Sequence, residues 1–325
     1  FVPGEEGRIT PQHFGAVADG TNDDTAAINA AIAYLIARGV NANKELYFPK
    51  GDYKVTSALT SFTGSRWNGY GQGMSTRVFA SGYNGDIFSF NITAATSTNN
   101  SLRGMWIDGP SSGTYTSAVG IHVIASAAAN FRFDHCFFED LWFRYCNDAI
   151  LLDDPYKQSY SGYNQIGSYF FHRYNRIQCV ATGTNTNQYG IRFAGASGAH
   201  HHFADNQIAA AVSGLKMGDG GTDTAVGDQT IVGGFYGAGT YPIHLIGPSG
   251  ALRYNRNVRI WGIQIDGSGI TNTYRFENMT DSGIIQHSTL QSVEGQLINC
   301  GLIEHGPRAT NRNLFPNGDL RIWQR

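Results

Sequence analysis

The chain has 325 residues, of which 41 are glycine, 13% are aromatic and only 15% are charged, and its formal net charge at pH 7 is −2. This composition is typical of many short strands joined by tight turns, and it argues against a helical or a disordered chain. The near-neutral charge gives no basic face for nucleic acid, and no apolar run is long enough to cross a membrane. We therefore expect neither nucleic-acid binding nor membrane insertion.

One amphipathic helix is predicted near the start, over residues 22–38. Side-chain oxygens just before it can accept from the free N–H groups of a first turn, and Gly39 supplies a stop. Its apolar stripe, at three- and four-residue steps, comprises Ile28, Ala31, Ile32, Leu35 and Ile36. The acidic residues Asp19, Asp23 and Asp24 resemble a catalytic cluster when taken alone, but we interpret them as turn and cap residues of this helix.

Strand patterns follow at 45–55 and 67–80, and then a four-residue motif recurs: a small, an aliphatic, a variable and an apolar residue. The aliphatic positions are Ile121, Ile150, Ile191, Leu215 and Ile243, with weaker copies at Tyr274 and Leu297. Their spacings, between 23 and 41 residues, suit one turn of a solenoid.

A second apolar strand precedes most copies of the motif, which predicts two or three strands per turn. The rival fold, a β-sandwich, needs hairpins closed by two-residue turns, and the Asp-Gly pairs of this chain do not separate paired alternating runs. We therefore predict an all-β chain, a parallel β-helix, with an N-terminal capping α-helix that covers the otherwise open end of the first turn.

Three segments near the start carry a family resemblance: FGAVADGTNDDTAAINAAI from Phe14, YFPKGDYKV from Tyr47, and the pattern G-x-G-x-x-S/T-x-V at Gly71 to Val78. They are similar to the opening segment of pectate-lyase-like right-handed β-helix proteins, especially phage tailspikes. The resemblance implies a right-handed β-helix and a homotrimer in a phage tail. It also implies that the protein binds a glycan, and such proteins usually cleave it. These signature residues are structural in that family, so they assign no catalytic residue.

The end of the chain, NLFPNGDLRIWQR from Asn313, resembles the beginning of a module that follows the β-helix in phage tail fibres and spikes. We therefore expect a longer protein, attached to other tail components through a region that precedes this sequence. The predicted organisation is a cap segment over 1–66, the parallel β-helix over 67–306, and a linker with the start of a following module over 307–325.

Candidate catalytic residues are sought among carboxylates, because glycoside hydrolysis uses two of them, roughly 5 to 9.5 Å apart. Glu139 and Asp140 are the first choice, and Asp153 and Asp154 rank next. Asp140 and Asp205 each lie ten residues before a motif position, which predicts a shared column two turns apart. Glu139 and Asp140 should point to opposite faces of one strand, so that only one of them faces outward.

Candidate substrate-binding residues lie in the longest turn, which carries the insertion DPYKQSYSGYNQ. Aromatic rings stack on sugars, and polar groups bind their hydroxyls. The expected contacts are Tyr156, Lys157, Tyr160, Tyr163, His172, Arg173 and Arg176. The same cationic and tyrosine side chains could instead support β-elimination on a uronate, which needs a base and a neutralising cation. The alternative without a binding role is a surface loop whose charged side chains are only solvated.

No metal and no cofactor are predicted. The run His200 to His202 alternates between faces, and the loop from Gly218 to Asp228 lacks the complete calcium pattern. The cysteines have no zinc spacing and are expected to be buried free thiols: Cys136, Cys146, Cys179 and Cys300.

The predicted function is that of a phage tailspike endo-depolymerase, made in the bacterial cytoplasm and acting outside the cell as part of the virion. Its substrate would be a bacterial surface polysaccharide, with hydrolysis favoured over elimination. The alternative of a different class is a spike that recognises a glycan without cutting it.

Overall fold

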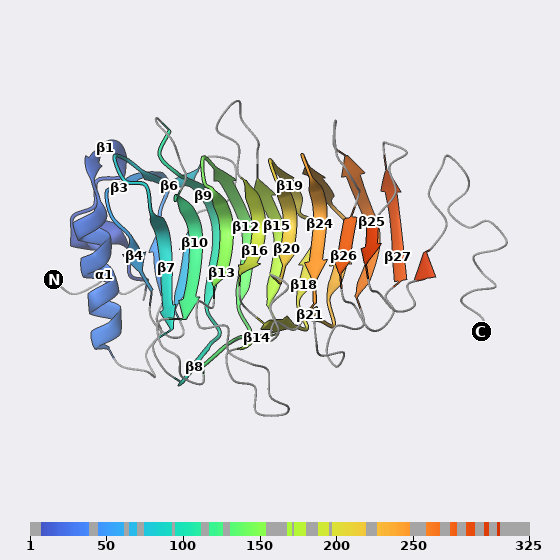
Figure 1. Cartoon of the computed structure of the whole chain (residues 1–325). Coiled ribbons are helices and arrows are strands. Elements are labelled where there is room, and N and C mark those ends of the chain that lie inside the picture. Colours follow the sequence, from blue (N-terminus) through green and yellow to red (C-terminus); the bar gives the residue numbers. More distant parts are fainter. Residues whose placement is uncertain are drawn as a thin grey trace.

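A computed structural model describes residues 8–38, 45–61, 65–69, 75–92, 95–111, 117–125, 131–153, 168–170, 172–179, 188–194, 197–218, 226–247, 258–266, 274–277, 284–289, 296–298 and 304–305. Its strands stack along one axis as a right-handed parallel β-helix, with the single α-helix at the N-terminal end (Figure 1). Every strand pairing among the described residues that is assigned a direction is parallel, as a solenoid requires. The fold predicted from the sequence is confirmed.

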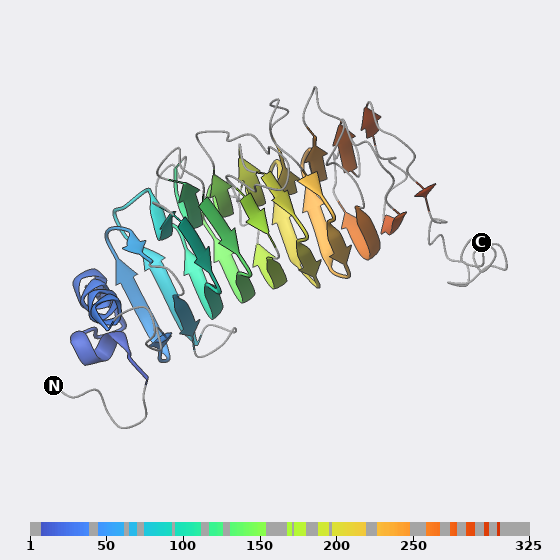
Figure 2. The same ribbon diagram turned by 90° about the horizontal axis from the view of Figure 1, so that it is seen from below.

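Three sheets run along the axis (Figure 2). A turn of the chain is called a coil below; successive coils contribute strands to sheets A and B, and among the described residues five of them also contribute a strand to the shorter sheet C. Sheet A comprises β1 (Asp19–Asp23), β2 (Glu45–Phe48), β3 (Gly51–Val55), β5 (Arg66–Gly69), β6 (Thr76–Ala80), β9 (Ser101–Asp108), β12 (Phe137–Arg144), β15 (Arg173–Cys179), β18 (His202–Ala204), β19 (Gln207–Ala210), β22 (Thr230–Val232), β23 (Phe235–Ala238), β25 (Arg259–Asp266), β27 (Ile284–Thr289) and β29 (Glu304–His305).

Sheet B comprises β4 (Leu59–Thr60), β7 (Asp86–Ile92), β10 (Val119–Ala125), β13 (Asp148–Asp153), β16 (Tyr189–Ala194), β20 (Ser213–Met217), β24 (Tyr241–Ile246), β26 (Tyr274–Glu277) and β28 (Gln296–Ile298). The short sheet C comprises β8 (Ala95–Thr98), β11 (Phe131–Asp134), β14 (Ser168–Phe170), β17 (Ser197–Ala199) and β21 (Val226–Gly227).

The recurring aliphatic residues of the sequence form one buried column of sheet B. Ile121, Ile150, Ile191, Leu215 and Ile243 are aligned in consecutive strands, and each is fully buried. Tyr274 continues the column beside Ile243. Leu297 pairs with Phe276 instead, two positions further along the strand. The repeat was thus correctly located in six coils and misplaced in the last one.

A second column, in sheet A, holds residues with a left-handed backbone. Its members have φ angles between 51° and 66° and are Gly104, Asp140, Arg176, Asp205, Gly233 and Gly262. One such residue per coil bends the strand and interrupts the alternation of side chains. Glu139 and Asp140 are consequently both partly exposed, with 20% and 36% of their side chains accessible. The prediction that only one of them faces outward was wrong.

The interior of the coil is packed with aromatic and aliphatic side chains. Phe138, Tyr174 and Phe203 occupy one column, and their rings stack with centroids 5.4 and 4.8 Å apart. Asn206 is buried next to them where β18 gives way to β19. Its side chain accepts from the N–H of Ile177 at 2.9 Å and donates to the carbonyl of Tyr174 at 3.0 Å, so it satisfies backbone groups that the interrupted ladder leaves unpaired.

The helix α1 (Thr25–Ala37) covers the N-terminal end of this core, as predicted. Ile28, Ala31, Ile32 and Leu35 are buried in the same cluster as the first strands, whereas Ile36 is 51% exposed and is not part of the buried face. A short 3₁₀ turn, η1 (Pro11–Phe14), packs beside the helix.

Carboxylates at the start of α1 bind local backbone and hydroxyl groups, as their interpretation as turn and cap residues required. Asp19 accepts from the N–H groups of Thr21 and Asn22, and Asp23 accepts from the N–H and the hydroxyl of Thr25. The Asp24 carboxylate accepts from the N–H of Val17, in the segment that precedes the helix. Three cysteines are buried free thiols as expected, Cys136, Cys146 and Cys179; Cys300 lies outside the described residues.

Two histidines lie inside the core with their rings 4.7 Å apart, His172 and His201. One ring nitrogen of His172 lies 3.0 Å from the Tyr174 hydroxyl and the other 2.5 Å from the Phe133 carbonyl. Burial lowers the pKa of His172 to about 3 and that of His201 well below its ordinary value. The folded protein therefore keeps both rings neutral, with His135 and His200 as nearby groups that disfavour a further positive charge.

These histidines make the fold sensitive to acid. The unfolded chain binds protons at His172 and His201 below its pKa of about 6.5, while the folded chain does not until far lower pH, so stability falls as pH drops from 6.5. The expected loss is about 1.4 kcal/mol per pH unit for each histidine, measured by urea unfolding between pH 7 and pH 4.5.

Replacing His172 by Phe should remove roughly half of this slope, whatever it costs in absolute stability. The exposed His200 serves as the control, because His200→Gln removes only a neighbour of His201 and should keep most of the slope. Equal slopes for wild type and His172→Phe would contradict the assignment.

Candidate functional site

The predicted carboxylates of sheet A lie in a row of ion pairs. Asp140 accepts from Arg176 of the next coil at 2.5 and 2.6 Å, and Asp205 occupies the same column one coil beyond Arg176. The shared column of Asp140 and Asp205 agrees with the register predicted from the sequence. Arg176 stands between them, however, and Asp205 packs over Gly233 of the next coil, where an added Cβ would lie 2.3 Å from its carboxylate. The two carboxylates therefore do not face one another across an open gap.

Glu139, the other first choice, is also paired. Its carboxylate lies 3.3 Å from the Arg103 guanidinium and accepts from the Asn175 amide at 3.0 Å. Glu139 and Asp140 are thus each bound by an arginine of a neighbouring coil, so both carboxylates already have partners within the fold.

The remaining predicted residues are spread over the molecule. Asp153 is the last residue of β13 in sheet B, on a different face from Glu139 and Asp140. Arg173 is exposed, with its guanidinium 5.7 Å from the Phe137 ring centre. The burial of His172 is incompatible with a substrate contact on the outer surface. Predictions that lie outside the described residues are Asp154, Tyr156, Lys157, Tyr160 and Tyr163.

Sheet B presents a column that sequence reasoning did not select. The variable third residue of each repeated motif lies on its outer face, in register from coil to coil: Ser89, His122, Leu151, Arg192, Lys216, His244 and Arg275. Four of the last five members are cationic or imidazole side chains. The signal was present in the sequence, because the third motif position is fixed by the same register as the buried second position.

His122 lies between two carboxylates from neighbouring coils. Its Nδ1 is 2.8 Å from Asp86, and its Nε2 is 3.8 Å from Asp153. Burial of the imidazole disfavours the charged form, but the Asp153 and Asp86 carboxylates outweigh it and raise the pKa of His122 to about 9. The imidazole is therefore a cation at neutral pH, with Nδ1–H on the side of Asp86 and Nε2–H on the side of Asp153.

Further along the column, cations and tyrosines from adjacent strands meet. Arg192 donates to the buried Asp148 at 2.5 and 2.7 Å, and its guanidinium lies 4.6 Å from the Tyr189 ring centre. The Lys216 ammonium lies 5.7 Å from the same ring. The cations can bind sugar hydroxyls or a carboxylate, and the tyrosine adds an aromatic edge and a hydroxyl beside them.

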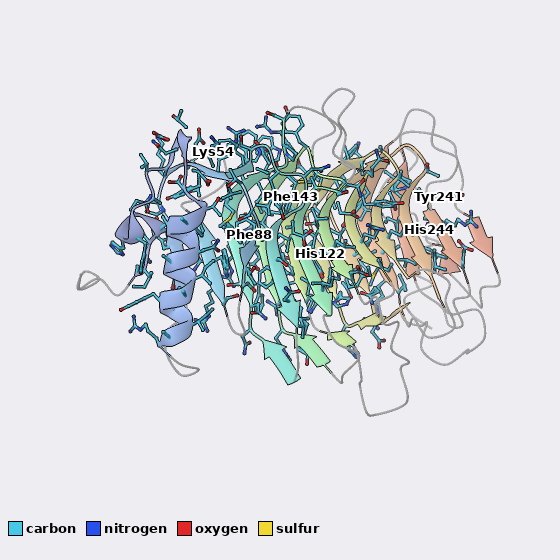
Figure 3. The ribbon with its side chains drawn as sticks, turned by 60° about the vertical axis from the view of Figure 1, so that its left-hand side comes forward. Lys54, Phe88, His122, Phe143, Tyr241 and His244 are labelled. Carbon is cyan, nitrogen blue, oxygen red and sulfur yellow. The ribbon has the colours of Figure 1, made fainter. Side chains whose placement is uncertain are left out.

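A second such group lies two coils further on. Arg275 donates to the Tyr241 hydroxyl at 2.7 Å and to Glu277 at 2.6 Å, and His244 lies 2.8 Å from Glu277. Burial lowers the pKa of His244, while His244 and Arg275 outweigh the effect of burial on Glu277 and lower its pKa. Figure 3 shows His122 and His244 at separate places along the same sheet, with Tyr241 close to His244. Sheet B therefore carries polar and aromatic groups over several consecutive coils.

Comparisons with known proteins agree with this architecture. Residues 10–107 match the family described as "Rhamnogalacturonase A/epimerase, pectate lyase-like". The fold is that of a pectate-lyase-like β-helix. No curated protein matches the chain.

Two solved phage structures are similar to the chain in fold. The pre-mature gene product 12 of bacteriophage phi29 has a TM-score of 0.54 at 13% identity, over 91% of this chain and 45% of that one. ORF18 of Geobacillus virus E2 has a TM-score of 0.50 at 17% identity, over 94% of this chain and 60% of that one. The chain thus spans about half to three fifths of these two proteins, and at such identities the likeness concerns the fold.

Within the described part of the chain, no three His, Cys, Asp or Glu side chains are grouped so that they could hold a metal ion. The only α-helix described there is too short and not apolar enough to cross a membrane.

The position of His122 predicts its titration. Its imidazole should stay protonated at pH 7.5 and titrate near pH 9, as followed by NMR of the ring protons. Asp86→Asn removes the partner at 2.8 Å and should lower this pKa, whereas Asp52→Asn, on sheet A, should not change it. Because the folded-state pKa is raised, the stabilisation is complete below about pH 6.5 and is lost as pH rises through 9. A wild-type titration near pH 6.5 would refute the ion pair.

Proposed function

We propose that the chain is the β-helix of a phage tail protein that binds and cleaves a bacterial surface polysaccharide, with the glycan lying across the outer face of sheet B. The observation that carries this proposal is the in-register column from His122 to Arg275, flanked by Tyr189 and Tyr241. A polymer has repeated units, and a row that repeats polar and aromatic groups from coil to coil offers each unit a similar environment.

The comparisons support the two halves of the proposal separately. The family matched by residues 10–107 is named for a rhamnogalacturonase and an epimerase and is described as pectate lyase-like, and the two similar folds come from bacteriophage phi29 and Geobacillus virus E2. A homotrimer, attachment to other tail components and a place in the virion follow from the same proposal. Fold likeness alone does not assign the activity, so the chemistry must come from the side chains.

Hydrolysis is the reaction that we propose for the group around His122. Substrate binding would open the 3.8 Å pair of His122 and Asp153; the protonated imidazole would then donate its proton to the leaving glycosidic oxygen, and the Asp153 carboxylate would accept a proton from the attacking water. The products are two shorter chains, one with a new reducing end. Asp86 holds the imidazole in its charged form and acts as a positioning residue.

β-Elimination is the second candidate, and one observation favours it. Tyr189 lies beside both Arg192 and Lys216, which places a phenol next to cations that could neutralise a uronate. Elimination would break the same bond without water and leave an unsaturated sugar.

A panel of bacterial capsular, O-antigen and exopolysaccharides tests these proposals. Hydrolysis gives new reducing ends alone, and elimination gives reducing ends together with absorbance of the unsaturated uronate. On a cleaved glycan, His122→Gln and Asp153→Asn should each reduce the rate at least roughly a hundredfold, the usual contribution of a positioned acid or base.

Glu139→Gln and Asp140→Asn are the matched variants on sheet A and should retain the rate. If these two lose activity and the sheet B variants keep it, cleavage belongs to the row that the sequence first indicated. Binding without cleavage of any glycan would identify a receptor-binding spike and reject the enzyme.

A further inference from the structure

A cluster on the outer face of sheet A, formed by β6, β9 and β12, takes no part in the proposed reaction. Asp108 is completely buried at its centre. Its carboxylate accepts from Arg77 at 2.7 Å and from Arg144 at 3.0 and 2.8 Å. Two guanidinium groups thus share one carboxylate, which leaves the cluster with an excess of one positive charge.

The cluster also has more hydrogen-bond donors than acceptors. In the described part of the chain, the outer guanidinium nitrogens of Arg77 make no hydrogen bond, and Asp108 is the only carboxylate that Arg144 contacts. Among the described residues, Trp106 and Trp142 stack beside them with ring centroids 4.5 Å apart, and neither indole N–H has an acceptor. The cluster therefore has several donors and no spare acceptor.

The guanidinium groups are held in place by flat neighbours. Arg144 lies 4.1 Å from the Trp106 ring centre, and Arg77 lies 4.4 Å from that of Phe79. Both remain partly accessible, at 22% and 27%. Their planes are therefore fixed while an edge of each is open to solvent, which is the arrangement that binds a planar oxyanion with little loss of entropy.

We propose that this cluster, named the arginine–tryptophan site (Arg77, Asp108, Arg144, Trp106 and Trp142), binds the carboxylate of an acidic sugar. The free guanidinium edges would take the carboxylate, and the half-buried Trp142 would contact the sugar ring. The site lies on a different sheet from His122, so it holds whether or not sheet B cleaves a glycan. It adds an anchoring position for a uronate-containing polymer.

Isothermal titration of the intact chain with sodium glucuronate tests the site, with glucose and sodium acetate as probes of the ring alone and the carboxylate alone. Glucuronate should bind more tightly than either. Arg77→Gln should weaken glucuronate binding roughly tenfold, as expected for the loss of one charge-assisted pair, while Arg144 still covers Asp108. Trp142→Ala, which removes the ring that would contact the sugar, should also weaken it.

Arg259→Gln is the matched control, an exposed arginine of β25 on the same sheet, and should bind glucuronate like wild type. Should Arg77→Gln fail to fold, Arg77→Lys keeps the charge but loses the planar fork and should still weaken binding. Acetate binding as tight as glucuronate, or equal losses in Arg77→Gln and Arg259→Gln, would overturn the proposal. If the protein cleaves no glycan but still binds glucuronate as expected, only the proposal for sheet B fails.

Discussion

The register between consecutive coils is the constraint on which the rest of the structure depends. Each strand pairs in parallel with its neighbours, so a position in one coil is repeated about 4.8 Å away in the next. A buried column such as Ile121 to Ile243 fixes this register, because a shift of one residue would turn apolar side chains outward. The left-handed residue in each coil, from Gly104 to Gly262, must then recur in the same column, and it does so with glycine or a polar residue.

Stacking also determines how charges are arranged. Identical charges in neighbouring coils repel at the distance between strands, and at three places opposite charges alternate instead, although Arg192 and Lys216 lie side by side in one column. Arg176 separates Asp140 from Asp205, His122 lies between Asp86 and Asp153, and Asp108 lies between two arginines. An ion pair on this surface is consequently a property of the fold before it is a sign of function. What distinguishes the group around His122 is that two carboxylates outweigh burial and keep an imidazole protonated at neutral pH.

The sequence allowed the architecture to be predicted because the repeat depends on the apolar residues themselves. The helix over the first coil, six of the seven repeat positions and the column shared by Asp140 and Asp205 could all be located by counting. Counting failed where one residue changed the geometry. The left-handed φ of Asp140 let two successive carboxylates face outward, and His172, interpreted as a surface residue beside Arg173, points into the core.

The candidate site was harder to predict than the fold for a related reason. Side chains near one another in the sequence are divided between sheets in a β-helix, so that Glu139 and Asp153, although 14 residues apart, lie on different faces. Side chains from neighbouring coils are brought together instead. Asp86 and His122 are 36 residues apart in the sequence, yet the Asp86 carboxylate lies 2.8 Å from Nδ1 of His122. A functional group in this fold is therefore assembled from one residue per coil, and local clusters of acidic residues are poor indicators of it. The third position of the repeated motif was the better indicator, since the register that buries the second position necessarily aligns the third on the outer face.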